Sequence, residues 1–214
     1  MSKLFIFNTE ILSAVFTNHK GKSSLLYAPI IFILMLLAGF YCEAQSPVQL
    51  APPLLKYHSV FFKKAADANK RFQGSGATAL IDNEGGITDM NASTWLGYQE
   101  GDVEINMLLA KKQALSSVLI NCLQNQGSWI FLPAQISVFY FDESKQSFEL
   151  LGEQLNAPNE KISTASCQPI IIAAAKKKKT KKIKIILKGI KNLPEWHAGK
   201  GQPGWLFIDE IKLY

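Results

Sequence analysis

Residues that could carry out catalysis are few and scattered in this chain of 214 residues. After an apolar N-terminal stretch only two histidines remain, His58 and His197, and no serine lies in a sharp-turn motif that would expose a nucleophile. Carboxylates do occur in pairs, at Asp142-Glu143 and Asp209-Glu210. Adjacent residues of a strand point to opposite faces, so neither pair could flank one scissile bond. The sequence therefore predicts that the protein is not an enzyme.

Binding chemistry is concentrated near the C-terminus, where Trp196 and His197 lie between Pro194 and Gly199. Loops framed by proline and glycine run over the surface, and flat aromatic rings there offer apolar faces to ligands. We therefore predict that Trp196 and His197 bind a ligand, with Tyr98 as a further candidate. The other three tryptophans lie in apolar, strand-like segments and are predicted to belong to the core: Trp95, Trp129 and Trp205.

The acids of the last apolar segment suggest a metal site. Asp209 and Glu210 are adjacent, so in a strand one of them lies on or near a buried face, where an unpaired carboxylate is costly. A calcium ion held by Glu210, by Asp82 and by loop carbonyl oxygens would remove this cost, because calcium takes several oxygen ligands. A salt bridge to a lysine, or exposure at a strand end, is the alternative. We predict a structural calcium ion with Asp82 and Glu210 as ligands.

Positive charge is concentrated in one run of lysines. The formal net charge is +6, and seven lysines lie between residues 176 and 184. The chain has a single arginine, Arg71, whereas nucleic-acid-binding proteins usually spread Lys and Arg over a face. We therefore predict no nucleic-acid partner and interpret the run as a solvated turn. A patch for an anionic polymer or a membrane surface is the alternative.

Residues 25–41 are uncharged and strongly apolar. This length suits a long signal-peptide core and is barely enough to span a bilayer, so residues 1–44 are predicted to be an export signal cut after Ala44. An uncleaved signal anchor is the alternative, and only then would the protein be held in a membrane. Export implies a secreted, periplasmic or cell-surface protein, in which Cys122 and Cys167 either pair or remain as buried thiols.

The elements that must position these residues are predicted to be strands. After residue 74 most of the chain alternates apolar and polar residues, for example at 103–107 and 182–185, and short polar turns separate the runs. Many short strands without crossover helices are typical of a β-sandwich or jelly roll, so the fold class is all-β. Residues 74–214 are predicted to form this domain, and residues 45–73 a linker or N-terminal extension.

Several short motifs occur in a characteristic order: ALID at 79–82, GI at 86–87, WLGY at 95–98, DVE at 102–104, FLP at 131–133, LPEWH at 193–197 and GWLFIDEI at 204–211. With them, residues 71–214 resemble the discoidin-like family, the coagulation-factor type C or galactose-binding-like domains, which includes the family-32 carbohydrate-binding modules. The resemblance is closest to the version appended to bacterial secreted β-N-acetylhexosaminidases.

This resemblance implies an eight-stranded jelly roll, commonly with a structural calcium at positions held here by Asp82 and Glu210. The chain departs from the family where it has Asp82-Asn83-Glu84-Gly85 in place of Asp-Gly. Residues and resemblance together predict an exported, non-catalytic module that recognises cell-surface or polysaccharide glycans through loops at one end of the sandwich. The alternative is an accessory domain that docks on a glycosidase and binds no sugar.

Overall fold

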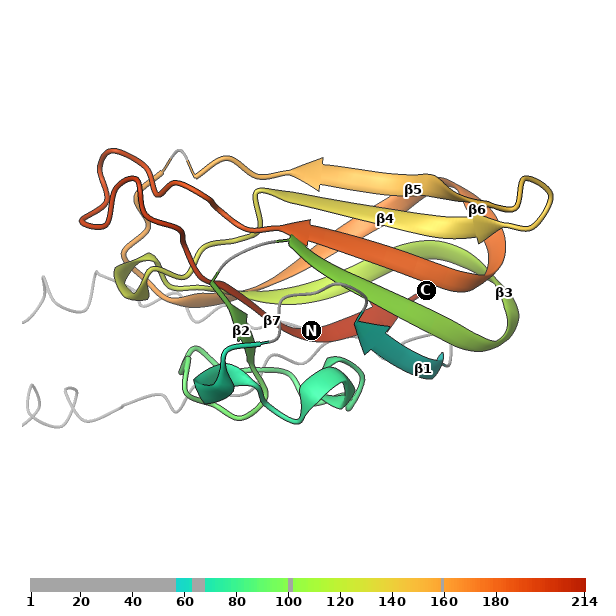
Figure 1. Cartoon of the computed structure of the whole chain (residues 1–214), viewed down its shortest axis with the longest axis horizontal. Coiled ribbons are helices and arrows are strands. Elements are labelled where there is room, and N and C mark those ends of the chain that lie inside the picture. Colours follow the sequence, from blue (N-terminus) through green and yellow to red (C-terminus); the bar gives the residue numbers. More distant parts are fainter. Residues whose placement is uncertain (1–56, 63–67, 100–101, 159) are drawn as a thin grey trace, which may run out of the picture. The chain divides into compact units, whose positions relative to one another are not determined.

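The computed structural model describes residues 57–62, 68–99, 102–158 and 160–214 (Figure 1). Within these ranges the chain forms strands and three short 3-10 helices, in this order: β1 (Tyr57–Phe62), η1 (Lys70–Phe72), η2 (Gly76–Leu80), β2 (Leu96–Tyr98), β3 (Asp102–Gln124), η3 (Gln126–Ser128), β4 (Gln135–Asp142), β5 (Ser147–Leu155), β6 (Ser166–Lys188) and β7 (Leu206–Leu213). No helix in the described part of the chain is long and apolar enough to cross a membrane. The predicted export segment, residues 1–44, lies outside the described residues.

Two strands of 23 residues each, β3 and β6, pair antiparallel along most of their length. Register shifts interrupt the ladder between Leu108 and Gln113 and between Leu115 and Ser117. On one side of these shifts, β3 also pairs with β1, and β6 pairs with β4, whose other neighbour is β5. On the other side, β3 pairs with β7, and β7 pairs with β2. The two long strands therefore run from one sheet into the other, as their curved ribbons show (Figure 1).

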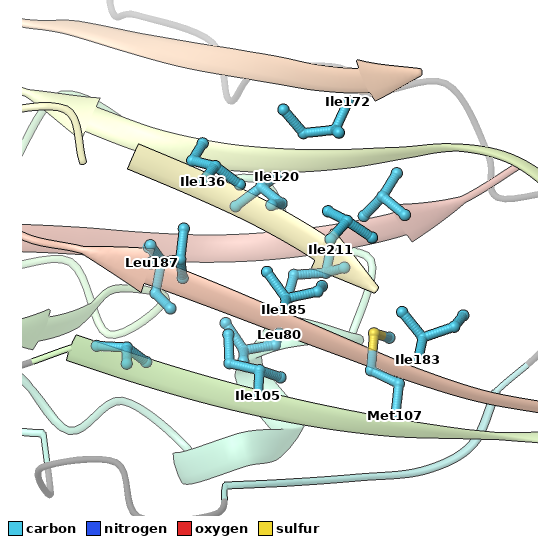
Figure 2. Packing of buried hydrophobic residues seen from close by; sticks show 14 of the residues in the cluster. Leu80, Ile105, Met107, Ile120, Ile136, Ile172, Ile183, Ile185, Leu187 and Ile211 are labelled. Carbon is cyan, nitrogen blue, oxygen red and sulfur yellow. The ribbon is translucent and has the colours of Figure 1, made fainter. Parts of the chain in front are cut away.

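The predicted all-β jelly-roll sandwich is confirmed by this arrangement. The resemblance implies eight strands, whereas the described residues form seven, because β3 and β6 each continue through both sheets without a break. Alternation along β6 explains how the sheets bury their inner faces. Ile183, Ile185 and Leu187 are buried, whereas Lys182 and Lys184 lie on the opposite face. Figure 2 shows these apolar side chains packed with others from β3, β4 and β7 in a single core.

A second apolar cluster closes one edge of the sandwich. Trp95 is almost fully buried, packs with Phe72 and Phe207, and donates its indole N–H to the carbonyl oxygen of Ile87 at 2.9 Å. A buried indole N–H needs such a partner. The prediction that Trp95 is a core residue is confirmed.

The sandwich includes residues that precede Gly74, where the sequence pattern predicts its start. β1 pairs with β3 from Tyr57 onward, and the amide of Asn69 donates to the carbonyl of Gly97 at 2.9 Å. Phe72 belongs to the second cluster. The apolar run at 57–62 is thus a strand of the sheet rather than part of a linker.

The lysine run is also a strand and not a turn. Residues 176–184 lie within β6, and residues 178–180 and 182–184 of the run pair with β3. The run contains no glycine, proline, asparagine or aspartate that would favour a turn. Strand pairing uses backbone N–H and C=O groups, so lysine side chains do not prevent it. The lysines are tolerated there because the strand at this point lies mostly at the surface.

Cys122 and Cys167 lie on neighbouring strands, β3 and β6, and both are free thiols. Burial, helped by the charge of Asp209, raises the pKa of Cys122 to about 12 and that of Cys167 to about 11. The Cys167 thiol donates to the carbonyl oxygen of Gly86 at 3.3 Å. Cys122 is a buried core residue, whereas Cys167 is half-buried at the edge of the second cluster.

Gly97 of β2 leaves no room for a side chain. A Cβ added there would lie 2.8 Å from the ring of Phe207 and 2.8 Å from Cβ of Phe72. We expect Gly97→Ala to lower the free energy of unfolding by about 1–3 kcal/mol, because overpacking displaces buried rings. Denaturant unfolding measures this. The matched control is Gly127→Ala, whose new Cβ would meet nothing closer than 3.7 Å; equal losses in both variants would contradict the packing.

Candidate functional site

A cleft of about 530 Å³ lies among three loops that follow or precede strands. Its walls come from residues 126–129 after β3, residues 161–163 before β6, and residues 196–198 in the long loop between β6 and β7. These loops lie at the same end of the sandwich, on the left in Figure 1. The lining residues are Gln126, Gly127, Trp129, Lys161, Ile162, Ser163, Trp196, His197 and Ala198. Trp196 and His197, predicted from sequence, are therefore both in the wall of a cleft.

Gln126 ties the three loops together. Its side-chain Nε2 donates to the carbonyl oxygen of Glu160 at 3.1 Å, and its Oε1 accepts from the amide of Ile162 at 2.7 Å. Its own backbone carbonyl accepts from Nε2 of His197 at 2.8 Å. The side chain is 4% exposed. Sequence reasoning missed Gln126, because a glutamine beside a turn glycine gives no sign of its long-range partners.

His197 positions the site rather than offering free hydrogen-bonding groups to a ligand. Its Nδ1 accepts from the amide of Gly199 at 3.0 Å, so in the neutral ring the proton lies on Nε2, which donates to Gln126. Both ring nitrogens are therefore engaged. His197 could therefore contact a ligand only through the carbon edge of its ring, and its two hydrogen bonds serve to hold the loop in place.

Aromatic rings form the apolar part of the cleft wall. Trp196 is half-buried, with its ring centroid 6.1 Å from that of Phe131 and 5.8 Å from that of His197. Trp129 meets His197 edge to face at 5.7 Å. The packing leaves part of Trp196 accessible, which a stacking residue requires.

The prediction that Trp129 belongs to the core is wrong, since Trp129 is half-buried and lines the cleft. Its backbone is left-handed, with φ 67°, and it ends η3. This conformation directs the ring toward Gly199, where a Cβ would lie only 2.6 Å from it. An apolar neighbourhood in the sequence does not reveal such a backbone conformation, and for that reason Trp129 was indistinguishable from a strand residue.

Tyr98 does not contribute to the cleft. It is 3% exposed and belongs to the main core in β2. Aromatic residues favour both buried strands and binding loops, so its type alone could not separate the two. The prediction of Tyr98 as a ligand-binding residue is not supported by its position.

Polar groups line the cleft together with the aromatic rings. Lys161 and Ser163 are exposed, and Ile162 between them is 37% exposed. Lys161 is the single charged side chain among the lining residues. The cleft therefore combines an aromatic surface with one ammonium group and one hydroxyl, and its described lining contains no carboxylate.

The paired acids of β7 lie in the protein interior, away from the cleft lining. Asp209 is fully buried, accepts hydrogen bonds from the amide of Gly86 and from Asn121 Nδ2, and leaves Oδ1 without a hydrogen-bond partner in the described part of the chain. Burial raises the pKa of Asp209 to about 8, against the opposing effect of the Gly86 amide. Asp209 is therefore a largely protonated core residue near neutral pH.

Glu210 and Asp82, the predicted calcium ligands, are close enough for the charge of Asp82 to raise the pKa of Glu210. Burial raises that pKa more, to about 7, and Lys212 opposes both effects. Glu210 Oε2 has no hydrogen-bond partner among the described residues, which suits a cation. However, Lys212 is itself buried and donates to Asn83 Oδ1 at 2.6 Å, in the same loop as Asp82. The Lys212 ammonium therefore already offsets part of the electrostatic cost of burying Glu210.

Two carboxyl groups could balance the charge of a cation. However, the described residues contain no group of three or more His, Cys, Asp or Glu side chains that could hold a metal ion. Calcium would have to take further oxygens from backbone carbonyls and compete with the Lys212 ammonium. Calcium bound by Asp82 and Glu210 stays a prediction.

Comparisons with known proteins give structural neighbours only. No family model matches the sequence, and no curated protein matches it. A pectin-binding carbohydrate-binding module has 16% identity and a TM-score of 0.43, covering 74% of this chain and 91% of that chain. The family 32 module of NanJ from C. perfringens, in complex with galactose, has 14% identity and a TM-score of 0.43, covering 72% and 92%. A second family-32 module of a family 31 glycoside hydrolase, bound to GalNAc, has 16% identity and a TM-score of 0.45, covering 73% and 97%.

Replacing Gln126 tests whether one side chain holds the cleft together. We expect Gln126→Ala to lower the free energy of unfolding by about 1–3 kcal/mol, since it leaves the Glu160 carbonyl and the Ile162 amide without their partner. Thermal or denaturant unfolding gives the value. Gln168→Ala is the control, because in the described part of the chain this half-buried glutamine donates only within its own strand, to Ser166. An equal loss of unfolding free energy in the control would contradict the view that Gln126 holds the three loops together.

Removing Lys212 tests the calcium prediction. Without the Lys212 ammonium in Lys212→Met the pKa of Glu210 should rise further, and a calcium ion between Asp82 and Glu210 would no longer compete with that ammonium, so added calcium should raise the melting temperature of this variant more than that of the wild type. Scanning calorimetry in excess calcium and in excess chelator measures both shifts. Lys191→Met, at an exposed site, should behave like the wild type. Melting temperatures unchanged by calcium in every protein would contradict the predicted site.

Proposed function

We propose that the protein is an exported, non-catalytic module that binds carbohydrate in the cleft between its end loops. The observation that carries the proposal is the half-buried Trp196 in the wall of a cleft that Trp129, Lys161 and Ser163 also line. A sugar ring has an apolar face of C–H groups and a rim of hydroxyls. Such a ligand needs an aromatic surface together with a few polar groups, which is the combination that this cleft offers.

The chemistry of the cleft supports binding rather than catalysis. Glycoside hydrolysis requires two carboxyl groups across the bond, and the described lining has none. The imidazole of His197 is held on both nitrogens and so is not poised to move a proton. Both acids of β7 are buried away from the cleft.

A single ammonium group, that of Lys161, sets an electrostatic preference. A neutral sugar can accept hydrogen bonds from this group, and a uronic acid would add an ion pair with it. The cleft is therefore suited to neutral or acidic glycans of the cell surface or of polysaccharides. Export by residues 1–44, a secreted, periplasmic or cell-surface location, and membrane attachment if that segment is uncleaved are parts of the same proposal.

The alternative function is docking on a protein such as a glycosidase, without sugar binding. It is favoured by two exposed apolar side chains on β5, the strand at the edge of its sheet: Leu150 is 50% exposed and Leu155 is 72% exposed. Exposed apolar groups on an edge strand suit a protein partner. Neither leucine lines the cleft, so substitutions separate the two functions.

Replacing Trp196 by Ala tests the proposal. We expect binding of the purified full-length protein to a glycan array to be selective for one sugar class, and Trp196→Ala to weaken it at least tenfold, or about 1.4 kcal/mol. Because Trp196 is only half-buried, its loss should cost about 1 kcal/mol of stability, well below the ~3–5 kcal/mol of a core tryptophan.

The control is Leu155→Ser, on the exposed edge strand, which should leave sugar binding unchanged. A blank array from folded wild-type protein, together with loss of enzyme docking in Leu155→Ser, would replace the proposal by its alternative. Sugar binding that survives Trp196→Ala would refute the role of the cleft.

A further inference from the structure

A ridge of lysines lies where the two long strands cross from one sheet to the other. It consists of the seven lysines between residues 176 and 184 of β6 and of Lys111 and Lys112 of β3, and we call it the lysine ridge. The register brings the strands together there, with Ala114 opposite Lys179 and Gln113 opposite Thr180. The bend of β3 and β6 is at the right in Figure 1, at the end of the sandwich away from the cleft loops.

The ridge has almost no counter-charge within the described part of the chain. Of its lysines, only Lys112 forms an ion pair there, with Glu143 at 2.7 Å and with both side chains largely exposed. Like charges on neighbouring strands repel one another. The ridge is therefore a concentrated positive surface that is not neutralised by the protein itself.

Several of these lysines are held against aromatic rings of neighbouring strands. The ammonium of Lys178 lies 5.2 Å from the ring centroid of Tyr140, that of Lys182 lies 4.8 Å from Phe141, and that of Lys184 lies 4.4 Å from Phe148. Cation–π contacts of this kind fix the side chains along the sheet. They hold the ammonium groups of Lys178, Lys182 and Lys184 close to the sheet.

We propose that the lysine ridge is a second binding site, separate from the cleft, that binds a linear acidic polysaccharide. Residues two apart on a strand share a face and lie about 6.6 Å apart, so the exposed Lys177, Lys179 and Lys181 present point charges at this spacing to an extended chain of carboxylates or sulfates. Lysine makes such contacts without the fixed geometry of a guanidinium group.

The composition of the ridge disfavours two other polyanions. Single-stranded nucleic acid needs free aromatic ring faces on which its bases stack. The rings of Tyr140, Phe141 and Phe148 are already covered by lysine ammonium groups. The one arginine, Arg71, lies elsewhere and donates to Asn91. A membrane surface is bound most firmly through inserted apolar groups, and none of the exposed large apolar side chains of the described residues belongs to the ridge.

The experiment is titration of the full-length protein with polygalacturonate at several salt concentrations, followed by calorimetry. Binding should weaken steeply and log-linearly with salt. The triple variant Lys177→Gln, Lys179→Gln and Lys181→Gln, at exposed positions, should bind at least tenfold more weakly and with a shallower salt dependence. The matching triple change to Arg keeps the charge and should keep the binding, which separates loss of charge from loss of fold.

A control triple, Lys70→Gln, Lys188→Gln and Lys191→Gln, removes the same charge from exposed sites outside the ridge. It should retain the steeply salt-dependent binding of polygalacturonate. So should Trp196→Ala, because a uronic acid in the cleft meets only the one charge of Lys161 and its binding depends weakly on salt; failure of the cleft proposal and failure of this one are therefore distinguishable. Equal weakening in the two triples, or absence of binding at low salt, would overturn the proposal. Tighter binding to an oligodeoxynucleotide or to phosphatidylserine vesicles of equal charge would overturn the choice of polysaccharide.

Discussion

The antiparallel ladder between β3 and β6 is the constraint on which the rest of the structure depends. Each strand is 23 residues long, and together they form a central pair in both sheets. At one end the ladder closes with Gln124 opposite Ser166. Residues 126–129 begin just beyond the first of these and residues 161–163 end just before the second, so two walls of the cleft are brought together by the register of the ladder. A slip of one residue would turn every core side chain to the other face.

The third wall depends on a few polar contacts rather than on strand pairing. The loop between β6 and β7 is held through His197, which bonds the carbonyl of Gln126 and the amide of Gly199. Gly199 also leaves room for the ring of Trp129. Trp196 is thus presented by a loop that is anchored on its neighbours, which limits the conformational entropy lost when a ligand binds. Rigid presentation of an aromatic ring is what separates this site from an ordinary exposed loop.

Local sequence pattern was enough to predict the sandwich, because alternation of apolar residues is a property of each strand by itself. It also identified Trp196 and His197, since proline and glycine mark a surface loop. Gln126, Trp129 and Tyr98 could not be placed in this way, because their roles depend on tertiary contacts or on a left-handed backbone. The lysine run was misread because like charges are usually found in turns, whereas here a long β partner provides the backbone pairing.

The most direct test of the account is an NMR titration of the isotope-labelled full-length protein with glycans, following backbone amides and tryptophan indole N–H signals. The account predicts saturable shifts for Trp196, Trp129 and the amides of residues 161–163, with the buried indole of Trp95 unchanged. Shifts confined to the outer face of β5, or no shifts with any glycan from a folded protein, would contradict it.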